Sequence, residues 1–175
     1  MDRGSGQLTR RWRAPRAELL MTLAVALCYA APLALSRYFP GLDLPWHAAI
    51  VAILRADEGA GAFLGYFAVD TRMSSYLTLY ALVRGVAAVV GDVAVAMQVV
   101  IAGYVVAFTL SAYALLRAFA GRGVLAVLAA PAAYSLTLEF GFLTHALSYP
   151  MTFVLWAAVR RAMIARPGRA GPALC

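Results

Sequence analysis

The chain has 175 residues, of which 63% are hydrophobic and only 13% are charged. Because charged residues make up roughly 25% of a soluble domain, this composition excludes an ordinary water-soluble globular protein. The formal net charge is +7, but the arginines border apolar runs, so membrane topology explains the charge better than nucleic-acid binding.

The apolar runs are continuous, which favours spanning helices over a barrel of alternating strands. We therefore predict an all-α, polytopic integral membrane protein with about four transmembrane helices. Residues 1–17 form a basic N-terminus with five arginines, ahead of a first helix over about 18–36. The excess of positive charge predicts that this N-terminus is cytoplasmic and that the first helix runs outward.

A long outer loop over residues 37–92 follows, and we expect two interfacial helices in it. The first covers about 45–57, with Trp46 on an apolar face and His47 on a polar face. The second covers about 75–90. It has only 16 residues and carries Arg84 at its centre, which costs roughly 2.5–3.5 kcal/mol in a bilayer, so we predict that it does not span.

Three further helices are predicted over about 93–116, 123–138 and 140–160, ahead of a cytoplasmic tail at 166–175. Residues 18–165 thus form a single membrane domain. Arginines flank these helices in a way that places both termini in the cytoplasm. All fifteen basic residues are arginine, which indicates a GC-rich bacterial genome and hence the bacterial cytoplasmic membrane.

Three polar residues on the outer side are candidates for catalysis: Asp43, His47 and Glu139. A carboxylate near the membrane surface can take a proton from a hydroxyl acceptor, or position that acceptor or a metal. A histidine four residues after Asp43 could assist it. Each also has a structural interpretation: Asp43 suits a helix N-cap, His47 the polar interface, and Glu139 a charged loop.

Three more residues are candidates for binding a lipid phosphate: Arg72, Arg84 and His145. Here, too, a structural interpretation stays open. Arg72 could pair with Asp70, Arg84 could extend its guanidinium to water, and His145 could form an interhelical hydrogen bond beside Ser148 and Tyr149.

The order of these segments, with the Gly91-Asp92 turn and the turn between Arg117 and Arg122, resembles the N-terminal module of the GT-C superfamily of polytopic glycosyltransferases. The stretch Asp43-Leu-Pro-Trp-His47 is similar to the acidic motif in the first outer loop of that superfamily. Phe140-Gly-Phe-Leu143 with Tyr149-Pro-Met151 is similar to a segment near its fourth helix.

The resemblance implies transfer of a sugar from a polyprenyl-phosphate donor at the extracytoplasmic face. Asp43 would act as catalytic base or would help to bind a divalent metal and the acceptor, and Glu139 would match a second acidic position. Members of the superfamily have more crossings than four, so we expect a truncated gene product. The alternative is a non-enzymatic polytopic protein, a scaffold or partner subunit that binds other membrane proteins and lipids.

Overall fold

The computed structural model describes residues 15–36, 43–57 and 76–165. Within these ranges every regular element is a helix and none is a strand. The all-α prediction is therefore confirmed for the described part of the chain.

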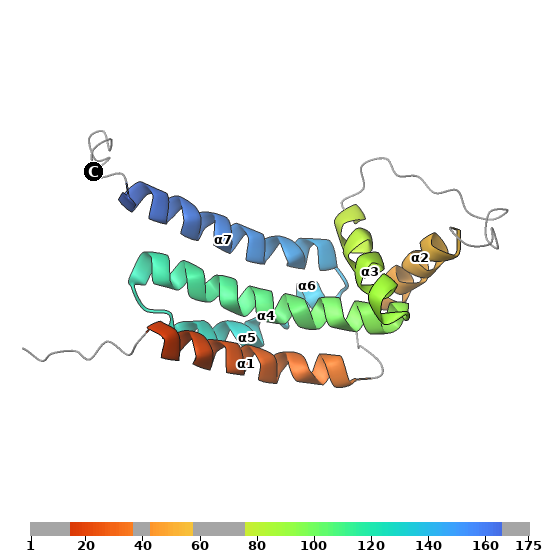
Figure 1. Ribbon diagram of the computed structural model, residues 1–175, viewed down its shortest axis with the longest axis horizontal. Coiled ribbons are helices and arrows are strands. Elements are labelled where there is room, and N and C mark those ends of the chain that lie inside the picture. Colours follow the sequence, from red (N-terminus) through yellow and green to blue (C-terminus); the bar gives the residue numbers. More distant parts are fainter. Residues whose placement is uncertain (1–14, 37–42, 58–75, 166–175) are drawn as a thin grey trace, which may run out of the picture.

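Three long helices lie side by side along the long axis of the molecule (Figure 1): α1 (Pro15–Leu35), α4 (Val93–Ala120) and α7 (Leu143–Ala165). The central helix α4 packs against both others, runs parallel to α7 and is antiparallel to α1. In the described part of the chain, two helical segments are long and apolar enough to cross a membrane, Arg16–Leu33 and Val93–Ala120. Helix α7 has the length, but His145, Ser148 and neighbouring polar residues lower its hydropathy.

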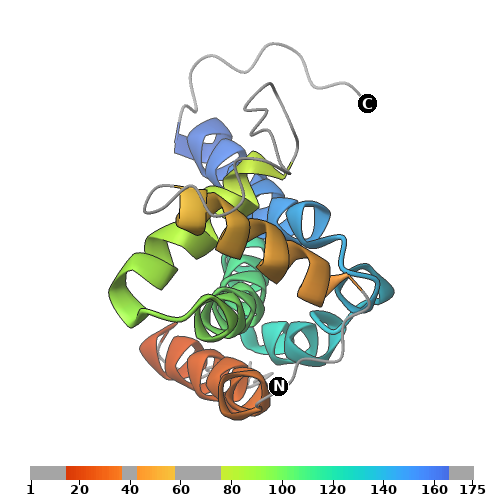
Figure 2. The ribbon, with the colours of Figure 1, turned by 90° about the vertical axis from the view of Figure 1, so that its right-hand side faces the viewer.

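Two shorter helices, α2 (Leu44–Asp57) and α3 (Leu77–Val90), lie at the end of the bundle where α4 begins (Figures 1 and 2). We call this the α2–α3 end. The chain turns from α3 into α4 at Gly91, whose φ of 82° suits a glycine. The Asp92 side chain then accepts a hydrogen bond from the Val95 N–H at 2.9 Å and caps α4.

The opposite end, which we call the arginine end, contains Arg117 in the last turn of α4 and Arg160 in the C-terminal part of α7. Here Glu18 of α1 accepts a hydrogen bond from the Gly123 N–H at 3.1 Å and lies 3.8 Å from the Arg117 guanidinium. The carboxylate therefore fastens the start of α1 to the turn that follows α4.

The segment predicted as one helix over about 123–138 is divided into three short helices instead. They are η1 (Val124–Leu128, a 3-10 helix), α5 (Ala129–Ala132) and α6 (Leu136–Glu139). Pro131 accounts for the irregular helix before it, since it has no N–H to donate to the Val127 carbonyl and its ring clashes with that carbonyl. The chain tightens after it, and the Tyr134 N–H bonds to the Pro131 carbonyl at 3.1 Å.

The last helix begins at Leu143, three residues later than predicted. Gly141 has a φ of 85° and ends α6 in a turn, in which the Phe142 N–H bonds to the Thr137 carbonyl at 2.9 Å. The glycine between two phenylalanines therefore separates the two helices where the apolar pattern alone runs on.

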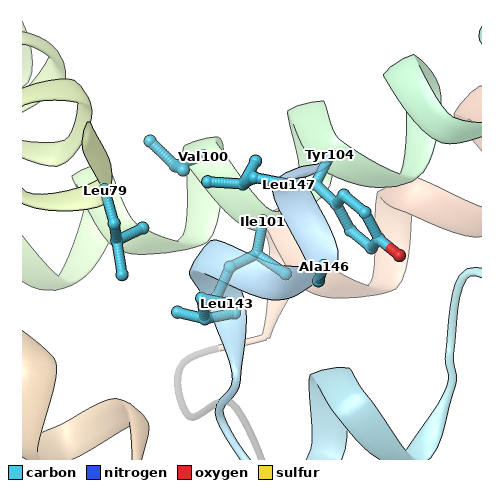
Figure 3. A pocket seen from close by; sticks show the side chains of 7 residues that line it. All are labelled: Leu79, Val100, Ile101, Tyr104, Leu143, Ala146 and Leu147. Atoms are coloured by element: carbon cyan, nitrogen blue, oxygen red, sulfur yellow. The ribbon is translucent and has the colours of Figure 1, made fainter. Parts of the chain in front are cut away.

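Helices α3, α4 and α7 meet in an apolar core near the α2–α3 end (Figure 3). Leu79, Ile101 and Leu143 are each buried there, around a void of only about 10 Å³. A void of this size is at the lower limit for a single water molecule. The three helices are therefore closely packed beneath the residues described next.

Candidate functional site

Asp43 lies immediately before α2, exposed at the α2–α3 end. Its backbone carbonyl accepts the first hydrogen bond of the helix, from the His47 N–H at 3.0 Å. Within the part of the chain that the structure describes, no hydrogen bond or ion pair engages the Asp43 carboxylate. An exposed carboxylate at a helix start is able to accept a proton or a hydrogen bond from a ligand.

The turn between α6 and α7 packs directly against Asp43. A Cβ atom built on Gly141 would lie 2.5 Å from the Asp43 Cβ and 3.2 Å from the Asp43 Cα and N atoms. The absent side chain of Gly141 thus makes room for the backbone of Asp43. Glu139, two residues earlier, is exposed on the same turn. The structure therefore brings all three catalytic candidates to the same end of the bundle, and two of them, Asp43 and Glu139, are exposed there.

His47, in contrast, lies inside the protein with only 4% of its surface exposed. Its Nδ1 is 3.1 Å from the Tyr80 hydroxyl of α3, and its ring lies 4.9 Å from the ring of Tyr76 at an angle of 34°. The prediction that His47 lies on a polar, outward-facing side of the helix is therefore wrong. The buried face of α2 is instead Leu44, His47 and Val51, at helical spacing.

The second ring nitrogen of His47, Nε2, is buried and has no hydrogen-bond partner among the described residues. Burial and the neighbouring Tyr76 raise the pKa of Tyr80, so its hydroxyl keeps its proton at neutral pH and can donate to Nδ1. In the tautomer in which Tyr80 donates to Nδ1, the ring hydrogen lies on Nε2. His47 therefore holds α2 against α3 one turn after Asp43, and one of its polar atoms lies unsatisfied in the interior.

The candidate phosphate-binding residues are spread over different elements. Arg84 is exposed on α3, and His145 is exposed near the start of α7, where its Nε2 lies 3.0 Å from the Tyr149 hydroxyl. That hydrogen bond is within one helix and does not join two helices. Arg72 falls outside the described residues.

Sequence reasoning missed Tyr76, Tyr80 and Gly141 as neighbours of the candidate residues. The two tyrosines are four positions apart and so share one helix face, a spacing that could have marked them as partners for a polar group. Gly141 had only the signal of an isolated glycine in an apolar run.

No metal centre is assembled at this end. Among residues 15–36, 43–57 and 76–165, no three His, Cys, Asp or Glu side chains are close enough together to hold an ion. The polar groups of the candidate site are therefore the carboxylates of Asp43 and Glu139, the imidazole of His47 and the hydroxyls of Tyr76 and Tyr80.

No protein-family model, curated protein or solved structure matches the chain.

Proposed function

We propose that the chain is a membrane protein that crosses the bilayer four times, with the arginine end in the cytoplasm and the α2–α3 end outside. The antiparallel arrangement of α1 and α4, both long and apolar enough to span, supports this orientation. Arg117, Arg122 and Arg160 all fall at the arginine end, as the positive-inside rule requires.

The broken segment from Val124 to Glu139 provides the third crossing in this proposal. A 3-10 helix rises about 2.0 Å per residue against 1.5 Å in an α-helix, so these residues extend roughly 25 Å. That length approaches the hydrocarbon thickness of about 30 Å. Helix α7 provides the fourth crossing and returns the chain to the cytoplasm.

We further propose that the outer end transfers a sugar from a polyprenyl-phosphate donor to a hydroxyl acceptor. The observation that carries this proposal is the exposed Asp43 carboxylate, free of partners in the described residues and supported by the tight contact with Gly141. Asp43 takes the proton of the acceptor hydroxyl while the hydroxyl oxygen attacks the anomeric carbon of the sugar. The bond between that carbon and the phosphate oxygen breaks, and the polyprenyl phosphate leaves with its electrons.

His47 contributes to this mechanism by position, because it is buried and cannot reach a bulky acceptor. Its bond to Tyr80 fixes α2 on α3, and through the backbone bond between His47 and Asp43 it holds the first turn that carries the carboxylate. Glu139 lies exposed on the turn beside Asp43, where it is able to orient the acceptor.

The test is transfer of labelled sugar from a set of polyprenyl-phosphate hexoses by the full chain in liposomes. Asp43→Asn keeps the size of the side chain but removes the base, and we expect at least about a 100-fold loss of rate. Glu139→Gln serves as the comparison, with a smaller loss. Normal transfer by folded Asp43→Asn would show that Asp43 is not the base.

A second function, as a partner subunit, is favoured by the surface of α4. Gly103 and Ala107 are exposed one turn apart, and no heavy atom lies within 4 Å of a Cβ placed on Gly103. Small residues at this spacing allow close approach of another helix. If this face binds a partner, Gly103→Leu abolishes co-purification of another membrane protein, while Asp43→Asn does not affect it.

A further inference from the structure

A groove lies between the C-terminal parts of α4 and α7 at the arginine end. It has a volume of about 370 Å³ and is lined by Phe119, Trp156, Val159, Arg160 and Met163. This volume is in the range of about 300–1,000 Å³ found for small-molecule sites. Four of the five lining side chains are apolar, and all four are exposed.

The one charged residue that lines the groove, Arg160, stacks on an aromatic ring. The guanidinium carbon of Arg160 lies 5.8 Å from the centre of the Phe119 ring, within cation–π distance. In the described part of the chain no carboxylate pairs with Arg160; the ion pair at this end joins Arg117 to Glu18. A fixed positive charge therefore borders an open apolar surface.

This combination selects for a ligand with an anionic group and a hydrocarbon chain. The C-terminus of α4 carries partial negative charge, which disfavours an anion unless a cation offsets it. Arg160 supplies that cation, and guanidinium binds phosphate with paired hydrogen bonds. Trp156 and Val159, which precede Arg160 on α7, offer the apolar surface along which a hydrocarbon chain lies.

We propose that this groove binds one anionic phospholipid of the cytoplasmic leaflet, with its phosphate on Arg160 and an acyl chain against Val159 and Trp156. Basic pockets between helices on the cytoplasmic side are suited to such head groups. The proposal uses the membrane orientation given above but is independent of sugar transfer.

The experiment uses Trp156 as the reporter. The chain has three tryptophans, so replacing Trp12 and Trp46 by phenylalanine leaves Trp156 alone. The protein is placed in vesicles that contain phosphatidylglycerol and phosphatidylcholine, with bromine on the acyl chains of one lipid or the other. Brominated chains quench the fluorescence of a tryptophan that they touch, so the two quenching curves give the relative affinity of the groove for each lipid.

We expect Trp156 to prefer phosphatidylglycerol by about five-fold, the effect of one arginine next to an anionic lipid. Arg160→Gln should reduce this preference to near unity. Arg122→Gln is the matched control, because Arg122 lies exposed at the same end but outside the groove, and it should keep the preference.

Three results would overturn the proposal. A preference that survives Arg160→Gln, or that Arg122→Gln lowers equally, means that surface charge in general attracts the lipid. Failure of both brominated lipids to quench Trp156 means that protein, a second copy or another chain, covers the groove. None of these readouts depends on transferase activity, so the two proposals fail separately.

Discussion

Replacing Gly141 by alanine tests whether the turn before α7 sets the position of Asp43. Gly141 combines a left-handed backbone with direct contact to Asp43: its φ is 85°, and an added Cβ would lie 2.5 Å from the Asp43 Cβ. Carbon atoms in contact are normally about 3.5–4.0 Å apart. The turn and Asp43 must therefore separate by about 1 Å.

Two other glycines allow the cost of backbone strain to be separated from the cost of the contact with Asp43. Gly91 has a φ of 82° but open space around it, and Gly103 has neither a positive φ nor a neighbour within 4 Å. We expect Gly91→Ala to lose about 1–2 kcal/mol of unfolding free energy from backbone strain alone. Gly141→Ala should lose about 1–3 kcal/mol more through overpacking. Gly103→Ala should be neutral or stabilising by up to about 1 kcal/mol.

The assay is unfolding of the purified protein in mixed micelles by titration with SDS, followed by helical circular dichroism. The order of stability should be Gly103→Ala, then Gly91→Ala, then Gly141→Ala. Under the proposed function a displacement of about 1 Å also lowers sugar transfer by roughly 100-fold. Equal destabilisation by Gly91→Ala and Gly141→Ala would refute the contact with Asp43.

Two further predictions concern partly buried polar contacts. Glu18→Gln removes the charge that faces Arg117 and weakens the acceptor for the Gly123 N–H, so the same titration should show a loss of about 1–2 kcal/mol; a change within about 0.3 kcal/mol would contradict the role given to Glu18. Tyr80→Phe leaves His47 Nδ1 without its partner and should cost about 1–3 kcal/mol at neutral pH. Because burial raises the pKa of Tyr80, its hydroxyl contributes stability fully below pH about 10 and loses that contribution as the pH rises through the folded-state pKa. The difference in unfolding free energy between wild type and Tyr80→Phe should therefore narrow above pH about 10. A difference that widens there would contradict the burial of the Tyr80 hydroxyl.

The helices around the Gly91-Asp92 turn could be predicted closely from the sequence, since they depend on local signals. Glycine in the left-handed region and aspartate at an N-cap act over only a few residues. The break at Pro131 was also encoded locally. The proline predicts a kink in one helix over about 123–138, whereas the structure has three short helices there.

The surroundings of His47 could not be predicted in the same way. Its burial depends on α3 lying across α2, and α3 is separated from it by a stretch of chain without a periodic pattern. A polar residue on an amphipathic helix is usually assigned to the solvent side. Only the packing of Tyr76 and Tyr80 against the ring reverses that assignment.

The contact between Asp43 and Gly141 is non-local in the same sense. The sequence placed Asp43 and Glu139 on one side of the membrane through the distribution of arginines, which is a statement about topology. Direct packing of the α6–α7 turn on the start of α2 requires the positions of both elements. No pattern within either segment contains that information.

The hydrogen bond from the Gly123 N–H to Glu18 joins residues 105 positions apart, which has a consequence for synthesis of the chain. When α1 leaves the ribosome, neither Arg117 nor Gly123 has been made, so under the proposed topology the Glu18 carboxylate stays hydrated at the membrane surface. It can be withdrawn from water only after all of α4 and the following turn have been translated. Release of the nascent chain before that point would leave α1 unattached at this end, in a form that membrane quality control could recognise.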